Sequence, residues 1–162
     1  ITMYVGQLMG KVDDEAVQMA GVIFSLAGIS GILAAPFWGD RGQRYGYVRT
    51  FCYITLGAGV VNLFQFFTTD VYQFAIVQFI FGLFLAGAIP NINANLAEVT
   101  DKSIRGKAFG LVTSAQMSGG FVGPLLGGAL GHVLPTRLVI ICAGIILIGV
   151  STFTYCTKVK GK

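Results

Sequence analysis

The side chains of this chain best placed to bind another molecule are amides set in apolar sequence. Asn91 and Asn95 are four residues apart, so a helix places them on one face, while Asn93 points elsewhere. A polar amide within an apolar helix needs a hydrogen-bonding partner. Two interpretations stay open: a polar patch on a cavity or an inner gate, and hydrogen bonds to a neighbouring helix.

No set of residues has the spacing that catalysis or metal binding requires. Cys52, Cys142 and Cys156 lack metal or redox spacing, and we expect them to pack as small apolar residues. The single histidine, His132, is expected at a solvated helix end rather than as a ligand or proton carrier. Phosphate-binding loops, dinucleotide fingerprints and Ser–His–Asp sets are also missing from the sequence. We therefore expect no enzyme, no cofactor and no metal site.

Long charge-free stretches indicate that membrane helices position these residues. Mean hydropathy is +0.75, and charged residues make up 11%, about half the fraction usual in a soluble domain. A membrane span needs about 20 apolar residues. Residues 1–10 are too short to span and are expected to end a sixth helix whose beginning is missing. We predict an all-α membrane bundle with five complete transmembrane helices, at about 16–38, 50–67, 71–97, 106–131 and 138–156.

Basic residues gather on alternate connections between these helices. Nine of the eleven lysines and arginines lie in 40–49, in 98–107 and in the tail after 157, while the opposite connections carry two basic and four acidic residues. The positive-inside rule places the basic side, and with it the C-terminus, in the cytoplasm. Membrane topology thus explains the net charge of +4, and we expect a lipid bilayer and no nucleic acid as partner.

A glycine ladder occupies the fourth predicted helix. Gly119, Gly123, Gly127 and Gly131 recur every fourth residue and fall on one helix face. Such a face lets another membrane helix approach backbone to backbone. Pro124 removes one backbone hydrogen bond and would fix a bend beside it. The alternatives are a functional seal between moving parts and ordinary close helix packing.

The other helices should differ in how deeply they are buried. The helices predicted at 50–67 and 138–156 have no strong polar face, so we expect both to lie at the lipid boundary. Short connections make successive helices antiparallel neighbours. Three helices would then line a cavity or an interface, which is typical of a transporter bundle rather than of a simple anchor.

Two motifs match the patterns of a known family. Residues 39–49, GDRGQRYGYVR, are similar to its inner-loop signature, and a spaced glycine pattern is similar to its antiporter motif. Together they resemble the major facilitator superfamily, in its bacterial multidrug efflux (drug:proton antiporter) branch. The signature positions are Gly39, Gly42, Arg44, Gly46 and Arg49, and the antiporter-type positions are Gly110, Gly119, Gly123, Pro124, Gly127 and Gly128.

Two departures from the family pattern point to the C-terminal half of such a transporter. The family's N-terminal half carries an arginine in its fourth helix, where this chain has Gln78. Gln43 stands where the signature has an aspartate, and departures from the signature at this position are common in the C-terminal copy. In the family the aspartate carboxylate docks onto the N-terminus of a neighbouring helix, and the neutral Gln43 side chain cannot supply that negative charge. The resemblance implies that 1–162 is the C-terminal six-helix repeat, with its first helix truncated. Its partner would be the N-terminal half of the same twelve-helix transporter.

The resemblance also implies a function. It implies export of amphiphilic drugs from the cytoplasm across the bacterial plasma (inner) membrane, by proton antiport and alternating access. No carboxylate lies mid-helix, so the proton acceptor is expected in the other half. Two alternatives stay open: a narrow exporter of a metabolite such as a sugar or siderophore, and a receptor-like relative that does not transport.

The resemblance assigns candidate site residues as well. At the inner end, we expect Glu98 to pair with Arg44 or Arg105 and to stabilise the inner-closed state; a solvated helix-end acid is the alternative. Asn93 resembles the family's recurring asparagine, and the fourth helix lines the cavity in the family. The expected cavity residues are Asn91, Asn93, Asn95, Ser114, Gln116, Met117 and Phe121.

Overall fold

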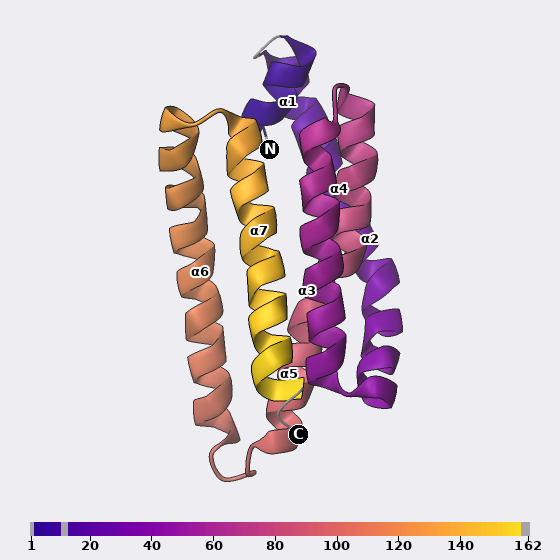
Figure 1. Cartoon of the computed structure of the whole chain (residues 1–162), viewed down its shortest axis with the longest axis vertical. Helices are drawn as coiled ribbons and strands as arrows, with labels where there is room; N and C mark the ends of the chain where they lie inside the picture. The colour runs from indigo at the N-terminus through magenta and orange to yellow at the C-terminus, as the bar shows by residue number, and fades with distance from the viewer. Residues whose placement is uncertain (1, 11–12, 160–162) are drawn as a thin grey trace.

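The computed structural model describes residues 2–10 and 13–159, and these form helices joined by short connections (Figure 1). A 3-10 turn over Gln65–Phe67 extends α3, and a π-helical turn over Tyr155–Val159 extends α7. The side chain of His132 and the tail residues 160–162 lie outside the described part. The α-helices described are α1 (Thr2–Met9), α2 (Asp14–Tyr45), α3 (Tyr47–Phe64), α4 (Val71–Leu85), α5 (Ala88–Val99), α6 (Arg105–Val133) and α7 (Thr136–Thr154).

Four helical segments of the described chain are long and apolar enough to cross a membrane. They are Asp14–Tyr45, Tyr47–Phe67, Val71–Val99 and Thr136–Lys158. α6 has 29 residues, but glycines and polar side chains interrupt its apolar sequence, and it is not among these four. Length and hydropathy therefore support four spans, and the fifth span, over α6, stays a prediction.

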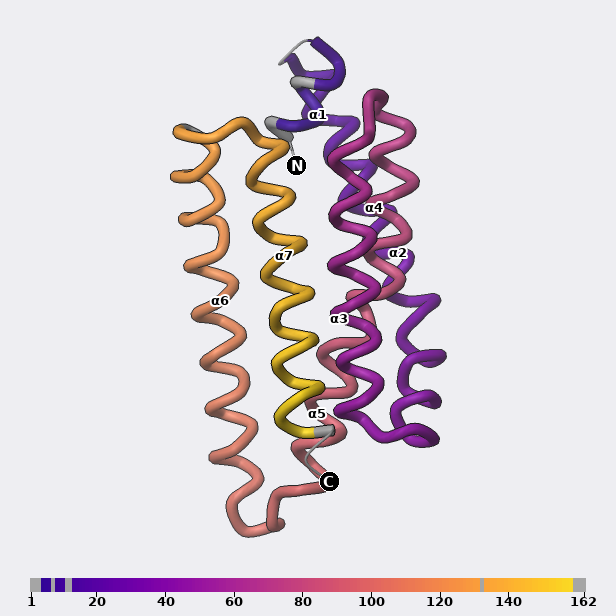
Figure 2. Tube along the Cα trace, viewed as in Figure 1, coloured from indigo at the N-terminus to yellow at the C-terminus, as the bar shows by residue number. Residues whose placement is uncertain are grey.

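Successive spans run antiparallel, so the charged connections separate to the two ends of the bundle (Figure 2). The α2–α3 junction, the α5–α6 connection and the end of α7 share the lower end in Figure 1. The α1–α2, α3–α4 and α6–α7 connections share the upper end. The lower end thus collects Arg41, Arg44, Arg49, Lys102, Arg105, Lys107 and Lys158, and the upper end Asp13, Asp14, Glu15, Asp70 and Arg137.

α3 packs on more helices than the expected peripheral position of residues 50–67 suggests, although Tyr53, Leu56, Val60 and Phe64 keep one of its faces exposed. α3 contacts α2, α4, α5 and α7. Its contact with α7 is closest where Gly59 faces Gly144: a Cβ built on either glycine would lie 3.1–3.2 Å from the other's carbonyl oxygen. Small residues, rather than a polar face, let this helix pack closely on α7. Its buried residues are Thr50, Cys52, Ile54, Thr55, Ala58, Gly59 and Asn62.

Candidate functional site

The signature segment 39–49 is a helix end with a one-residue junction, and not the tight loop predicted from its charges. α2 continues to Tyr45, and Gly46 alone separates it from α3. Gly46 has a φ of +91°, a conformation that glycine adopts without strain. Its N–H donates to the carbonyl of Gly42 at 3.0 Å and closes the last turn of α2. The signature glycine at 46 therefore makes the sharp turn between two spans.

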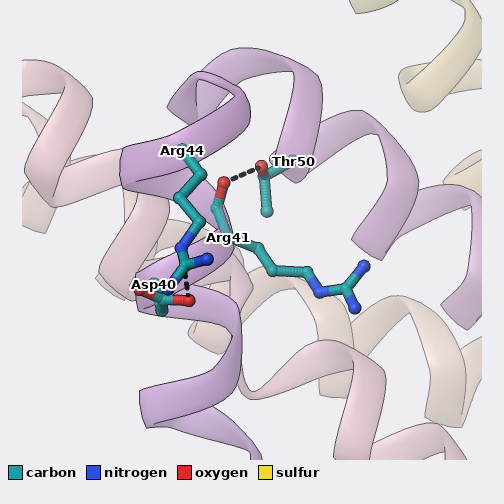
Figure 3. A network of polar contacts seen from close by, with 4 residues as sticks. All are labelled: Asp40, Arg41, Arg44 and Thr50. Carbon is teal, nitrogen blue, oxygen red and sulfur yellow. Dashed lines mark hydrogen bonds and ion pairs between the residues drawn. The ribbon is translucent and has the colours of Figure 1, made fainter.

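The charged side chains of Asp40, Arg41 and Arg44 lie along the last turns of α2 (Figure 3). Arg44 Nε lies 2.9 Å from Asp40 Oδ2, and both side chains are more than half exposed. Arg41 instead stacks its guanidinium on Phe37, with Cζ 4.5 Å from the ring centroid. The Thr50 hydroxyl of α3 donates to the Arg41 carbonyl at 3.3 Å. An exposed pair four residues apart on a helix contributes about 0.3–0.5 kcal/mol, so it supports the helix end without locking it.

Gly42, the small residue of the signature, is buried beneath Asn91 of α5. A Cβ at Gly42 would collide with the Asn91 side-chain oxygen and would lie 2.7 Å from Cδ1 of Tyr47. Asn91 is 1% exposed, and its Nδ2 donates to the carbonyls of Gly87 at 2.8 Å and Trp38 at 3.2 Å. Its Oδ1 is buried with no hydrogen-bond partner in the described structure. These contacts favour the helix–helix interpretation of Asn91.

Trp38 of α2 joins the same cluster at the break between α4 and α5. In a continuous helix the Gly87 N–H would bond to the Leu83 carbonyl, but it points to the Phe84 carbonyl at 3.3 Å. The indole Nε1 of Trp38 donates to the freed Leu83 carbonyl at 2.7 Å. A Cβ at Gly87 would lie 2.5 Å from the Trp38 Cβ. Trp38 of α2 therefore stabilises the bend of the Val71–Val99 span by this hydrogen bond and by packing on Gly87.

The predicted cavity residues occupy two separate regions. Asn91 and Asn95 line a pocket of about 550 Å³ between α3, α5 and the end of α7, and Asn93 is half-buried elsewhere on α5. The remaining four, Ser114, Gln116, Met117 and Phe121, lie along α6 and do not line this pocket. Gln116 is half-buried and the other three are exposed.

The predicted gate charges do not meet in this structure. Glu98 is exposed near the end of α5. Arg105 donates from Nη2 to the Ala97 carbonyl at 2.7 Å and from Nε to the Thr100 carbonyl at 3.1 Å, which caps the end of α5. Within the described residues Arg44 pairs with Asp40 instead. The pairing of Glu98 with Arg44 or Arg105 stays a prediction.

The glycine ladder is open along its length. α6 lies beside α7 at the edge of the bundle, and its main contacts are with α5 and α7 (Figure 1). A Cβ built on any ladder or antiporter-type glycine would find no atom within 4 Å among those described; these glycines are Gly110, Gly119, Gly123, Gly127, Gly128 and Gly131. α6 also continues as a helix through Pro124. The close approach that the ladder predicts is therefore not made among the described residues.

A second pocket, of about 500 Å³, lies between α3, α4, α6 and α7, and Tyr4 of α1 also lines it. Three amides line it: Gln65 Nε2 donates to Gln78 Oε1 at 2.8 Å, and Asn62 lies one turn before Gln65. We call it the amide pocket. Its opposite wall is the upper part of the α6 ladder, from Pro124 to Gly131.

Comparison with known proteins decides the family. The sequence pattern of the Major Facilitator Superfamily matches residues 8–159. The chain belongs to the major facilitator superfamily. This confirms the family predicted from the two motifs and makes the chain part of a multi-pass membrane protein. The chain is 30% identical over 162 residues to "Multidrug resistance protein MdtG" of Escherichia coli O1:K1 / APEC, and equally to that of the strains SMS-3-5 / SECEC and SE11.

The alignments cover 99% of this chain and 39% of each relative. The major facilitator chain described here thus spans about two-fifths of the length of the curated relatives it matches. Its family membership is established over almost the whole sequence, and the function of the longer protein is a matter of inference.

Sequence reasoning overlooked the amide pocket of this major facilitator chain. In the sequence, Gln78 stands out only because the family's N-terminal half has an arginine at the corresponding position, and Gln65 and Asn62 belong to no motif. The available signal was the occurrence of single amides within apolar runs, as in FAIVQFIFG. Such amides need partners in a membrane, and here Gln65 and Gln78 partner each other across the α3–α4 turn.

Proposed function

We propose that this chain is the C-terminal half of a drug exporter that couples efflux to proton entry by alternating access. The family membership and the multidrug resistance relatives support transport of amphiphilic molecules. The observation that carries the proposal is the open glycine face of α6, which holds the antiporter-type motif and meets no described atom of this chain. A matching half would pack on that face.

The glycine face would set the distance between the two halves. Gly119 and Gly123 have no side chain, so a helix of the partner half could approach the α6 backbone closely. Close packing would exclude water and ions from the seam while the halves rock around a midplane cavity. A bulky side chain on the face would hold the halves apart and disturb both the seal and the motion.

Proton coupling would depend on the other half. Every acidic residue of this chain lies near the end of a helix or in a connection, and Asp40, the acid of the signature segment, is more than half exposed and paired with Arg44. A proton carrier in a transporter normally lies inside the membrane. The basic lower end would face the cytoplasm, in a bacterial plasma membrane, with the C-terminus on that side.

The test uses the complete gene expressed in everted membrane vesicles. Ethidium accumulation is followed while an acid-inside proton gradient is imposed and then collapsed with an ionophore. Accumulation that depends on the gradient is the expected result. If correctly inserted protein accumulates neither ethidium nor other unrelated dyes, a narrow metabolite exporter or a receptor-like protein replaces the proposal.

A further inference from the structure

We propose that the pocket between α3, α5 and the end of α7 binds the headgroup of an anionic membrane lipid. We call it the lower pocket. Its volume is about 550 Å³, and its described lining comes from α3, α5, α7 and the turn that extends α7. The proposal goes beyond drug export and requires only that the chain crosses a membrane.

The lower pocket lies where three membrane spans end. One span begins at Tyr47, another ends at Val99 and a third ends at Lys158, and all three residues line the pocket. These ends share the lower side of the bundle in Figure 1. The end of a membrane span lies at the level of the lipid headgroups, where tyrosine and lysine are common. The pocket is therefore placed to receive a headgroup.

The lower pocket carries a positive charge without a negative one. Lys158 lines it, and its described lining includes no aspartate or glutamate. The ion pair found among the described residues joins Arg44 to Asp40, so Lys158 has no described acidic partner. Lysine binds phosphate as a point charge, and basic pockets between membrane helices bind anionic lipid headgroups. Charge complementarity therefore favours a phosphate over a cation.

The first turn of α3 adds to this positive potential. Tyr47 and Val48 of that turn line the pocket. The turn contains no acidic residue, and no side chain caps it. The N-terminus of a helix carries a partial positive charge, which an anion nearby offsets. Lys158 and the start of α3 thus favour the same kind of ligand.

The remaining lining combines hydrogen-bond donors with apolar walls, as a lipid requires. The donors are half-buried and so open to a ligand: the hydroxyls of Tyr47 and Thr154 and the amide of Asn95. A phosphate has oxygens to accept from these groups. The apolar walls, which suit the start of the acyl chains, are Val48, Phe51, Ile92, Leu96 and Val99.

Asn91 lines the lower pocket and has an unused hydrogen-bond acceptor. Its Nδ2 donates twice, but its Oδ1 is buried with no partner in the described structure. A Cβ built on Gly42 would contact both this oxygen and the ring of Tyr47, so the oxygen lies beside a ring that lines the pocket. A buried acceptor normally has a protein or water partner. A glycerol headgroup, which brings hydroxyl donors, therefore suits this wall, and we take phosphatidylglycerol as the lipid to test.

The test titrates dioleoyl phosphatidylglycerol into the complete transporter in detergent and measures bound lipid by native mass spectrometry. The wild type should bind this lipid more tightly than dioleoyl phosphatidylcholine, which has the same chains and no net charge. Lys158→Gln should weaken phosphatidylglycerol binding by about three- to tenfold, the loss of one lysine–phosphate contact. Lys102→Gln removes an exposed lysine from the same end but outside the pocket, and it should leave the Kd unchanged.

A second variant fills the lower pocket without changing its charge. Val48→Trp places a large ring on the pocket wall and should also weaken phosphatidylglycerol binding. Val60→Trp makes the same change on an exposed face of α3 outside the pocket and should leave binding unchanged. Thermal unfolding of both variants establishes that they are folded.

Three results would overturn the lipid site. Equal affinity of the wild type for the two lipids would remove the preference for an anion. Equal weakening by Lys158→Gln and Lys102→Gln would indicate general attraction to a basic surface rather than binding in the pocket. Displacement of the lipid by an equal concentration of glycerophosphoglycerol, the headgroup without chains, would make a soluble phosphate ester the ligand. None of these results depends on ethidium accumulation, so drug export and lipid binding are tested separately.

Discussion

The side-chain oxygen of Asn91 lies where a side chain on residue 42 would begin, so Gly42 and Asn91 each limit what the other can be. Asn91 comes from α5 and Gly42 from the signature segment at the end of α2. Glycine at 42 leaves room for the Asn91 amide, whose Nδ2 donates hydrogen bonds to the carbonyls of Trp38 in α2 and Gly87 at the start of α5. This contact connects the inner-loop signature of the family to the bend in the Val71–Val99 span.

Gly42→Ala should destabilise the protein, because the new Cβ would collide with the Asn91 side chain and crowd Tyr47. Overpacking of a tight contact costs about 1–3 kcal/mol. The measurement is thermal unfolding of the purified transporter. Gly39→Ala is the matched control, since a Cβ there has no neighbour within 4 Å, and it should leave Tm unchanged or slightly higher. Equal Tm values for the two variants would contradict the contact.

Trp38→Phe should also lower stability, because it removes the indole N–H that satisfies the Leu83 carbonyl at the α4–α5 break. This hydrogen bond is half-buried, and one hydrogen bond contributes about 0.5–1.5 kcal/mol net. Denaturant unfolding of the same protein measures the loss. Phe37→Leu, at the neighbouring exposed position, should have a smaller effect. A Trp38→Phe variant as stable as the wild type would show that this hydrogen bond does not hold the bend.

The contact of α3 with α7 predicts a difference between two glycines. Gly59→Ala places a Cβ 2.7 Å from Ile148 Cγ1 and 3.1 Å from the Gly144 carbonyl, so the two helices would have to separate. We expect a loss of about 1–3 kcal/mol. Gly149→Ala, in α7 with no neighbour within 4 Å, should be neutral or stabilising by up to about 1 kcal/mol, since alanine is the better helix former. Thermal unfolding that ranks the two variants in the opposite order would contradict this packing.

Asp40→Asn should leave proton coupling intact, because the Asp40–Arg44 pair is exposed at a helix end. The stability change should be below about 1 kcal/mol. The measurement is gradient-dependent ethidium accumulation in everted vesicles. Accumulation that no longer responds to the proton gradient would place a coupling carboxylate in this half, against the proposed function.

Local sequence patterns predicted the parts of this structure that depend on few neighbours. Hydropathy located four of the spans, and the spacing of Gly39 to Arg49 and Gly110 to Gly128 identified the family. The predicted loop at 40–49 was wrong because a charged run was taken for a connection. Glycine at 46 lets one residue make the turn.

Burial depends on partners that a single sequence does not display. The close packing of α3 on α7 follows from Gly59 meeting Gly144, residues far apart in the chain that carry no polar signal. The pairing of Gln65 with Gln78 likewise requires the fold around the α3–α4 turn. Asn91 and Phe121 were expected to line one cavity from two different helices, and in the structure Asn91 lines a pocket that Phe121 does not.

The most direct test of the proposed function compares Gly123→Leu with the wild-type transporter in the everted-vesicle assay. Gly149→Leu on α7 is the control, since that position also has free space but lies outside the glycine ladder. The account predicts gradient-dependent ethidium accumulation in the wild type and in Gly149→Leu, and its loss in correctly inserted Gly123→Leu. Normal accumulation by Gly123→Leu would contradict the proposal that the α6 glycine face packs against the other half during transport.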